Sequence, residues 1–196
     1  MLRLSMNETN IQDLLQKIVF EDDQQAFKML YFQYYKKLYN LASFYVRSAE
    51  ATEEVVNDTF ISIWSRRKFL ADITDFTSYI YKAVKNKSLN FLKQRNFPIH
   101  FNIDDIKAEI EDVTLNIEDQ MIVADFQLLI EHAVNNLPAQ CRLVFKMIKE
   151  DGLPHKEVAE LLNLSVRTIE YHMSIALKKL SESLNYKKNT PQVSSK

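Results

Sequence analysis

Glycine is almost absent from this sequence: Gly152 is the only one in 196 residues, and there are four prolines. The tight turns, bulges and hairpins of β-rich folds depend on glycine, because it adopts positive φ without steric cost. Phosphate-binding loops and dinucleotide-binding folds also need glycines where the backbone approaches the ligand. The shortage therefore favours an all-α protein, and it excludes enzymes built on a P-loop or a GxGxxG turn.

Cysteines, metal-ligand motifs and long apolar runs are lacking as well. Cys141 is the only cysteine, so an internal disulfide and a thiolate zinc cluster are excluded, and we expect this residue to be a small buried hydrophobe. None of the four histidines has a metal-ligand spacing such as HExxH. No apolar run approaches the ~18 residues of a transmembrane helix, and the N-terminus has none that is long enough for a signal peptide. We expect a cytoplasmic protein without a metal, a cofactor or direct membrane insertion.

Charge is distributed unevenly, although the net charge is only -1. Residues 76–102 contain five cations and no carboxylate, whereas residues 97–120 contain seven carboxylates against Lys107 alone. This change of sign, opened by Pro98 and lacking a sustained helical stripe, predicts a linker between two helical domains. The predicted divisions are a helical domain at 1–96, an acidic linker at 97–120, a second helical domain at 121–186 and a flexible tail at 187–196.

Capping signals and periodicity predict four helices in the N-terminal domain. Thr9 with Gln12, and Asp22 with Gln25, have the spacing of an N-cap residue and its partner, so helices should begin near residues 10 and 23. The second of these continues at helical spacing to Val46. The third is expected between 48 and 68 with Val56, Phe60, Ile63 and Trp64 inward, and the fourth, capped by Asp75 or Thr77, runs to about 95 after a loop at 69–76.

The fourth predicted helix gathers its cations on one side. Ile80, Val84 and Phe91 share one face of a helical wheel, and the opposite face carries Lys82, Lys85, Asn86 and Lys93. Surface helices usually mix charge signs to gain i,i+4 pairs, so phosphates are the expected counter-charges here. Tyr79 and Tyr81 lie beside the lysines and can stack on unpaired bases. The alternative is an ordinary solvated lysine face with tyrosines in the core.

The C-terminal domain has the layout of a helix-turn-helix. A helix over 121–136 is followed by one that starts at Pro138 and stops at Gly152, and then by the short helix "HKEVAELL". Asn163 occupies the next turn, where glycine would be expected, because asparagine tolerates positive φ. Ser165 then caps the last helix. Any packed helical hairpin could share this layout, so the side chains must decide.

The last helix has an apolar inner stripe and a polar outer face. Arg167 and Thr168 lie in its first turn, where helix N-terminal amides meet phosphates or base edges. Arginine can bind guanine bidentately and Glu170 can accept from cytosine N4, so base readout is chemically feasible. The outer face continues through Tyr171, Ser174 and Lys178, flanked by Glu170 and His172, and the inner stripe consists of Val166, Ile169, Met173, Ala176, Leu177 and Leu180.

These segments carry a family resemblance over residues 10–184. The run "LPAQCRLVFKMIKEDGLPHKEVAELLNLSVRTIEYHMSIALKKL" resembles the promoter-reading C-terminal domain of the extracytoplasmic-function sigma factors of bacterial RNA polymerase. Upstream, "EEVVNDTFISIWSRR" and "SYIYKAVKNKSLNFLKQR" resemble two consecutive core helices of that family's N-terminal domain. The resemblance implies a sigma factor that binds core polymerase and directs promoter recognition, DNA opening and transcription initiation. It implies no catalytic residue and no small-molecule substrate.

The resemblance also assigns roles to positions of this sequence. Glu54, Asn57, Asp58 and Ile61 match positions that dock on the clamp helices of the polymerase's largest subunit. Tyr79, Lys82, Lys85, Asn86, Asn90 and Lys93 belong to the helix that engages the minus-10 element, and residues 69–77 match the loop that captures a flipped-out base. Arg167, Thr168, Glu170, Tyr171, His172, Ser174 and Lys178 belong to the minus-35 reading helix. Contact with the polymerase flap, a linker in the polymerase cleft and an anti-sigma partner are further implications.

Some positions depart from the family pattern, and two other functions stay open. Asn57 replaces a usual glutamine, Asn90 an aspartate, Asn163 a glycine and Pro154 a capping serine. A stand-alone helix-turn-helix regulator would use the same last two helices, but it would bind its operator tightly without polymerase. A helical protein-binding adaptor would show no salt-dependent affinity for DNA.

Overall fold

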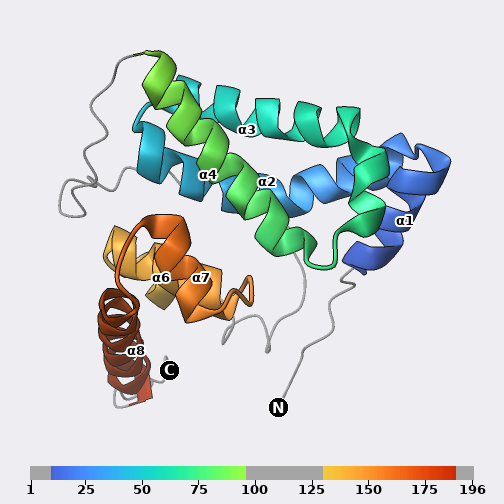
Figure 1. Ribbon diagram of the computed structural model, residues 1–196. Coiled ribbons are helices and arrows are strands. Elements are labelled where there is room, and N and C mark those ends of the chain that lie inside the picture. Colours follow the sequence, from blue (N-terminus) through green and yellow to red (C-terminus); the bar gives the residue numbers. More distant parts are fainter. Residues whose placement is uncertain (1–9, 96–129, 189–196) are drawn as a thin grey trace, which may run out of the picture. The chain divides into compact units, whose positions relative to one another are not determined.

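Every regular element in the described parts of the chain is a helix (Figure 1). The computed structural model describes residues 10–95 and 130–188, with side chains as far as residue 183. The chain divides into two compact units, Met1–Phe101 and Asn102–Lys196. The prediction of an all-α protein is confirmed. The predicted linker at 97–120, the expected helical residues 121–129 and the tail from 189 onward lie outside the described residues.

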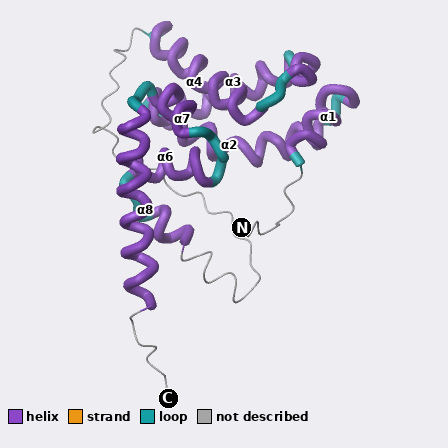
Figure 2. The backbone as a smooth tube through the Cα atoms, turned by 60° about the horizontal axis from the view of Figure 1, so that its bottom comes forward, coloured by secondary structure: helices purple, strands orange, loops and turns teal. Residues whose placement is uncertain are grey.

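The first unit is built around one long helix. It contains α1 (Ile11–Glu21), α2 (Gln24–Val46), α3 (Ala49–Ser65), the 3₁₀ helix η1 (Arg67–Asp72) and α4 (Phe76–Gln94). α2 packs against α1, α3 and α4, so it lies at the centre of this unit (Figures 1 and 2). Apolar residues recur on α2 every three or four positions, which buries one continuous stripe. This stripe meets inward residues of α3 and α4, and the fully buried members include Leu30, Tyr34, Leu38, Leu41, Val56, Ile80 and Val84.

The first two helices begin where the sequence predicts, but other residues cap them. Asn10 caps α1, and its Oδ1 accepts a hydrogen bond from the Gln12 amide at 3.1 Å. Asp23, not Asp22, caps α2, with Oδ1 2.7 Å from the Gln25 amide nitrogen. Asp22 instead ends α1 with φ 53°, in the left-handed region. An N-cap residue needs extended backbone, which Asp23 has and Asp22 does not.

The connection between α3 and α4 is more ordered than the predicted loop at 69–76. η1 covers its first half, because the Phe69 and Ile73 amides make i→i+3 hydrogen bonds and Leu70 is only 3% exposed. Within the predicted loop at 69–76, only residues 73–75 lack helical structure. Asp75, the first of the two predicted candidates, caps α4 by accepting from the Ser78 amide at 3.0 Å.

The second unit contains helical residues 130–135, α6 (Ala139–Lys149), α7 (His155–Leu162) and α8 (Val166–Lys188). α8 packs against both α6 and α7. Cys141 is buried, as predicted, and burial raises the pKa of its thiol. One hydrophobic cluster of this unit consists of Ala133, Val134, Leu137, Cys141, Ala176 and Leu180.

The turn between α7 and α8 forms as the sequence predicts. Asn163 has φ 56° and ψ 44°, the left-handed conformation expected there. The Leu164 amide donates to the Ala159 carbonyl at 2.9 Å, which satisfies one of the last carbonyls of α7. Ser165 Oγ accepts from the Thr168 amide at 3.0 Å and so caps α8. Over residues 10–95 and 130–188, no helix combines the length and apolar character needed to cross a membrane.

Candidate nucleic-acid interface

α4 separates its polar and apolar side chains as the helical wheel predicts. Ile80 and Val84 are 0% exposed and Ser88 is buried beside them on the inner face. The opposite face carries exposed Lys82, Asn86, Asn90 and Lys93, with Lys85 half-buried. We call this set the α4 polar face. Its side chains lie together on one side of the first unit.

The two tyrosines on α4 differ in accessibility. Tyr79 is 36% exposed, and its ring centroid lies 6.3 Å from that of Phe76. Tyr81 is 1% exposed, so the expectation that it could stack on a base is wrong. Tyr81 lies about 100° from Ile80 on the wheel, so the buried side of α4 is wider than the predicted stripe. Tyr79 therefore remains the one of the two that can meet a base.

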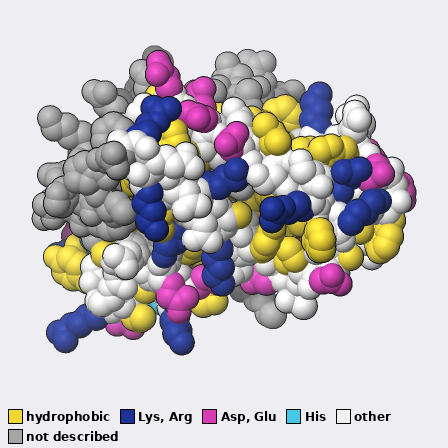
Figure 3. Space-filling view, turned by 45° about the horizontal axis from the view of Figure 1, so that its top comes forward, with side chains coloured by type: hydrophobic (Ala, Val, Ile, Leu, Met, Phe, Trp, Pro, Cys, Tyr) yellow, Lys and Arg dark blue, Asp and Glu magenta, His cyan; other side chains and the backbone are white. Residues whose placement is uncertain are grey.

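Carboxylates on α3 approach cations on α4, a feature that the charge pattern of α4 alone does not reveal. Lys87 Nζ lies 3.8 Å from Asp58 Oδ2, and Arg95 Nη2 lies 3.6 Å from Glu54 Oε2. Figure 3 shows basic side chains at the surface with acidic side chains beside some of them. The α4 cations are therefore of two kinds, those directed to α3 and those on the α4 polar face.

α3 presents a second polar surface, made of the predicted polymerase-docking residues. Glu54, Asn57 and Asp58 are exposed, and Ile61 is an apolar side chain with 63% of its surface exposed. We call these four residues the α3 docking face. The inward stripe expected for α3 consists of Val56, Phe60, Ile63 and Trp64. The first three are buried, and Trp64 is half-buried against Phe27 and Arg67.

Aromatic side chains of α2 border the α3 docking face. The Tyr31 hydroxyl donates to Asn57 Oδ1 at 3.1 Å, and the Tyr31 ring packs 4.6 Å from that of Phe60. Burial, and then the nearby Glu53 carboxylate, raises the pKa of Tyr31. The sequence alone does not predict this contact. Tyr31 and Tyr35 have i,i+4 spacing on one helix, but only the packing of α2 on α3 shows that Tyr31 contacts Asn57.

η1 exposes one large aromatic side chain. Phe69 is 71% exposed, whereas the next residue, Leu70, is 3% exposed and fixes the inner side of this short helix. An exposed phenylalanine beside basic residues is suited to stacking on an unpaired base. Phe69 belongs to the segment 69–77 that the sequence singled out.

α8 displays most of the predicted minus-35 residues on its outer face. Arg167, Glu170, Ser174 and Lys178 are exposed, and Tyr171 is 62% exposed. Thr168 differs because its Oγ1 lies 2.8 Å from Ser165 Oγ, which makes it part of the helix cap. The exposed five form a continuous strip along the first three turns, and we call them the α8 reading face.

His172 does not belong to the α8 reading face, and the expectation that it flanks that face is wrong. Its side chain is 8% exposed, and Nδ1 lies 3.5 Å from Cys141 Sγ on α6. Three residues after buried Ile169, His172 falls on the same side of the helix. The predicted inner stripe also needs correction along one edge, because Val166 is 40% and Leu177 50% exposed, and the two lie side by side on the helical wheel. The buried strip is thus rotated toward His172.

Comparisons with known proteins match both units. Residues 30–97 match the family model described as Sigma-70 region 2, and residues 127–180 match the one described as Sigma-70, region 4. The chain is 26% identical to the ECF RNA polymerase sigma-E factor of Salmonella typhimurium (strain 14028s / SGSC 2262) over 172 residues, covering 84% of this chain and 89% of the relative. The protein of the same name from Escherichia coli (strain K12) gives the same identity and coverage.

Among solved structures, the chain is similar to the sigma factor RpoE in complex with the anti-sigma factor NepR from Bartonella quintana. The two are 19% identical with a TM-score of 0.44, and the match covers 81% of this chain and 96% of that one.

Proposed function

The chain belongs to the extracytoplasmic-function sigma factors of the sigma-70 family, and from this premise we propose how its surfaces divide the work. As a sigma factor it directs transcription initiation with core RNA polymerase at promoter DNA. We assign polymerase binding and the minus-10 element to the first unit. The minus-35 element is assigned to the second unit.

The α3 docking face is the proposed contact with the clamp helices of the polymerase's largest subunit. It combines an exposed apolar side chain, Ile61, with the flanking carboxylates Glu54 and Asp58 and with Asn57. An apolar anchor surrounded by polar groups is typical of protein interfaces. Tyr31 holds the Asn57 side chain in one orientation, so this amide does not need to be ordered on binding.

The α4 polar face and Tyr79 are the proposed contact with the minus-10 element. Lysines bind phosphates without regard to sequence, whereas the amides of Asn86 and Asn90 can recognise base edges. We propose that the exposed Phe69 contacts the flipped-out base. Extruding a base costs a few kcal/mol, and stacking on an aromatic ring offsets part of that cost.

The α8 reading face is the proposed contact with the minus-35 element. The observation that carries this assignment is the turn itself: Asn163 ends α7, Ser165 starts α8, and Arg167 and Tyr171 follow on the exposed side. A recognition helix enters the major groove with its N-terminal residues against base edges. Thr168 supports this helix by taking part in its N-cap, and His172 supports it by packing in the core of the unit.

Several further properties follow from this function as proposals. The polymerase flap is expected to hold the second unit near upstream DNA, and an anti-sigma factor is expected to mask both DNA-binding faces. The segment at 97–120 is the proposed acidic linker. Transcription initiation takes place in the cytoplasm, where we place this protein. Promoter recognition and opening require no bond-making side chain, so we assign it no enzymatic activity.

Reconstituted transcription tests the proposed function. Purified chain is mixed with core RNA polymerase and a library of supercoiled promoters, and the initiated transcripts are sequenced. Chain-dependent initiation at promoters with shared minus-35 and minus-10 sequences is the expected result. Tight operator binding by the chain alone would indicate a stand-alone regulator instead. DNA binding that is unchanged when Arg167 or Lys82 is mutated would indicate a protein-binding adaptor, which makes no phosphate contacts of its own.

A further inference from the structure

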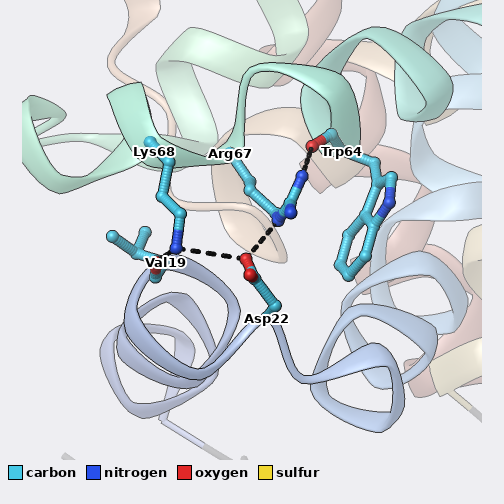
Figure 4. Close-up of polar contacts among 5 residues, drawn as sticks. All are labelled: Val19, Asp22, Trp64, Arg67 and Lys68. Carbon is cyan, nitrogen blue, oxygen red and sulfur yellow. Dashed lines mark hydrogen bonds and ion pairs between the residues drawn. The ribbon is translucent and has the colours of Figure 1, made fainter.

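A charged cluster joins the end of α1 to η1 (Figure 4). Asp22 Oδ1 lies 2.5 Å from Arg67 Nε and 3.1 Å from Lys68 Nζ. Lys68 Nζ also donates to the Val19 carbonyl at 2.6 Å. Two adjacent residues of η1 are thus held by groups 45 and more positions earlier in the chain. Asp22 precedes the residues matched to the region 2 family model, which begin at 30.

The C-terminal end of α1 carries negative charge that attracts these cations. The last carbonyls of a helix have no partner inside it, and they carry partial negative charge. Val19 provides such a carbonyl, and Asp22 adds a full negative charge in the left-handed conformation that turns the chain toward α2. Hydrogen bonds from Arg67, and then from Lys68, lower the pKa of the Asp22 carboxyl. The carboxylate is therefore charged throughout the neutral range.

η1 also packs along α1. Six residues of 3₁₀ helix have little stability of their own, so outside contacts must set its orientation. Leu70 fixes one side by burial, and Arg67 Nη1 donates to the Trp64 carbonyl at 3.0 Å. The Arg67 guanidinium also lies 4.6 Å from the Trp64 ring centroid. The contacts with Asp22 and Val19 fix the remaining side, next to exposed Phe69.

We propose that Asp22 is a positioning residue for the single-stranded DNA contact: by holding Arg67 and Lys68 against the end of α1, it sets the place from which Phe69 meets the flipped-out base. This inference rests on the proposed function of η1. Asp22 itself does not touch DNA in this account. Its side chain is half exposed and outside the core, so its loss should change the orientation of η1 more than the stability of the unit.

The proposal is tested by measuring whether replacing Asp22 changes the contribution of the captured base to DNA affinity. Holoenzyme is assembled with wild-type chain, Asp22→Asn or Glu21→Gln, and its affinity is measured for a non-template oligonucleotide with the minus-10 sequence from the promoter library. A second oligonucleotide is abasic at the flipped position. Asparagine tolerates the left-handed conformation, so Asp22→Asn removes the charge and keeps the helix end. Glu21→Gln removes the same charge one residue earlier and serves as the matched control.

Wild type and Glu21→Gln should each bind the abasic oligonucleotide about tenfold more weakly than the intact one, as expected for one stacked base. Asp22→Asn should bind both with nearly equal, reduced affinity, because η1 no longer presents Phe69 to the base. Arg67→Gln breaks the same contact from the other side and should behave alike. If thermal unfolding shows that Asp22→Asn does not fold, the abasic penalty of Arg67→Gln tests the proposal by itself.

Three results would overturn the proposal, and they can be told apart. A full tenfold abasic penalty in both Asp22→Asn and Arg67→Gln would show that Asp22 does not position the base contact. An equal loss of the penalty in Glu21→Gln would indicate a general effect of charge. If wild type has no abasic penalty at any position, base capture by this unit is itself wrong, and the proposal for Asp22 is lost with it.

Discussion

At the scale of single residues, neighbouring side chains on one helix have opposite roles. Tyr171 is 62% exposed on the α8 reading face, whereas His172 is 8% exposed and contacts Cys141. The sequence supports either assignment for a histidine beside a polar face, because its ring is both apolar and hydrogen-bonding. Only the position of α6 shows that the strip facing the core includes His172.

Replacing His172 with Ala should destabilise the second unit by about 1–3 kcal/mol, because it empties a buried site and removes the partner of Cys141. Tyr171→Ala should change stability by less than about 0.5 kcal/mol, since that ring faces solvent. Urea unfolding monitored by circular dichroism gives both values. The reverse order would mean that Tyr171, and not His172, belongs to the core.

The pH dependence of the Asp22 contact follows from the direction of its pKa shift. The pKa of this carboxyl is lowered from its ordinary value of 3.8, first by the Arg67 and then by the Lys68 hydrogen bond. A lowered folded-state pKa means that the contact contributes above pH 3.8 and is lost as pH falls through the lower, folded value. Trp64 fluorescence should therefore differ between wild type and Asp22→Asn at pH 7 and converge in acid. A difference that persisted at full protonation would contradict this account.

At the scale of helices, periodicity predicted most of the elements, and tertiary contacts decided their ends and charges. The apolar spacing of α2 fixes its face and its end at Val46, and Asn163 with Ser165 defines the turn before α8. The exchange of roles between Asp22 and Asp23 could not be predicted, because both are good caps and the choice depends on how α1 turns into α2. η1 was missed because its hydrogen bonds depend on the burial of Leu70 and on the end of α1.

The two kinds of α4 cation should respond differently to neutralisation. Lys93 belongs to the α4 polar face, whereas Lys87 lies 3.8 Å from Asp58 on α3. Lys93→Gln should reduce the slope of log affinity against log salt by about 0.7–0.9, the value for one phosphate contact. Lys87→Gln should reduce it by less. Holoenzyme binding to one promoter between low and moderate salt gives both slopes, and equal reductions would contradict the division.

At the scale of the whole molecule, the proposed function requires two DNA-reading units on one chain. The chain forms two compact units, Met1–Phe101 and Asn102–Lys196. The acidic linker expected at 97–120 from the change of charge sign lies outside the described residues, so it stays a prediction. Composition alone excluded β-rich folds and glycine-dependent nucleotide sites, but it could not locate a DNA-binding surface in a chain with net charge -1. That surface depends on how helices sort charges to one side, as α4 and α8 do.

The proposed acidic linker should act after promoter binding. If it lies in the polymerase cleft, its carboxylates resemble a nucleic-acid backbone in charge. Neutralising four of them should leave promoter affinity unchanged and alter the yield of short early transcripts. Gel analysis of abortive products tests the variant that combines Asp104→Asn, Asp105→Asn, Glu109→Gln and Glu111→Gln. Unchanged transcript lengths would count against a position in the cleft.

Selection from a promoter library with both elements randomised tests whether the two units read two separate DNA elements. Core polymerase is supplied with wild-type chain, Arg167→Ala or Asn86→Ala, and initiated promoters are sequenced. Wild type should select two sequence elements at a fixed spacing. Arg167→Ala should relax only the upstream element, and Asn86→Ala only the downstream one. Selection of a single element, or relaxation of the same element by both variants, would contradict separate reading by the two units.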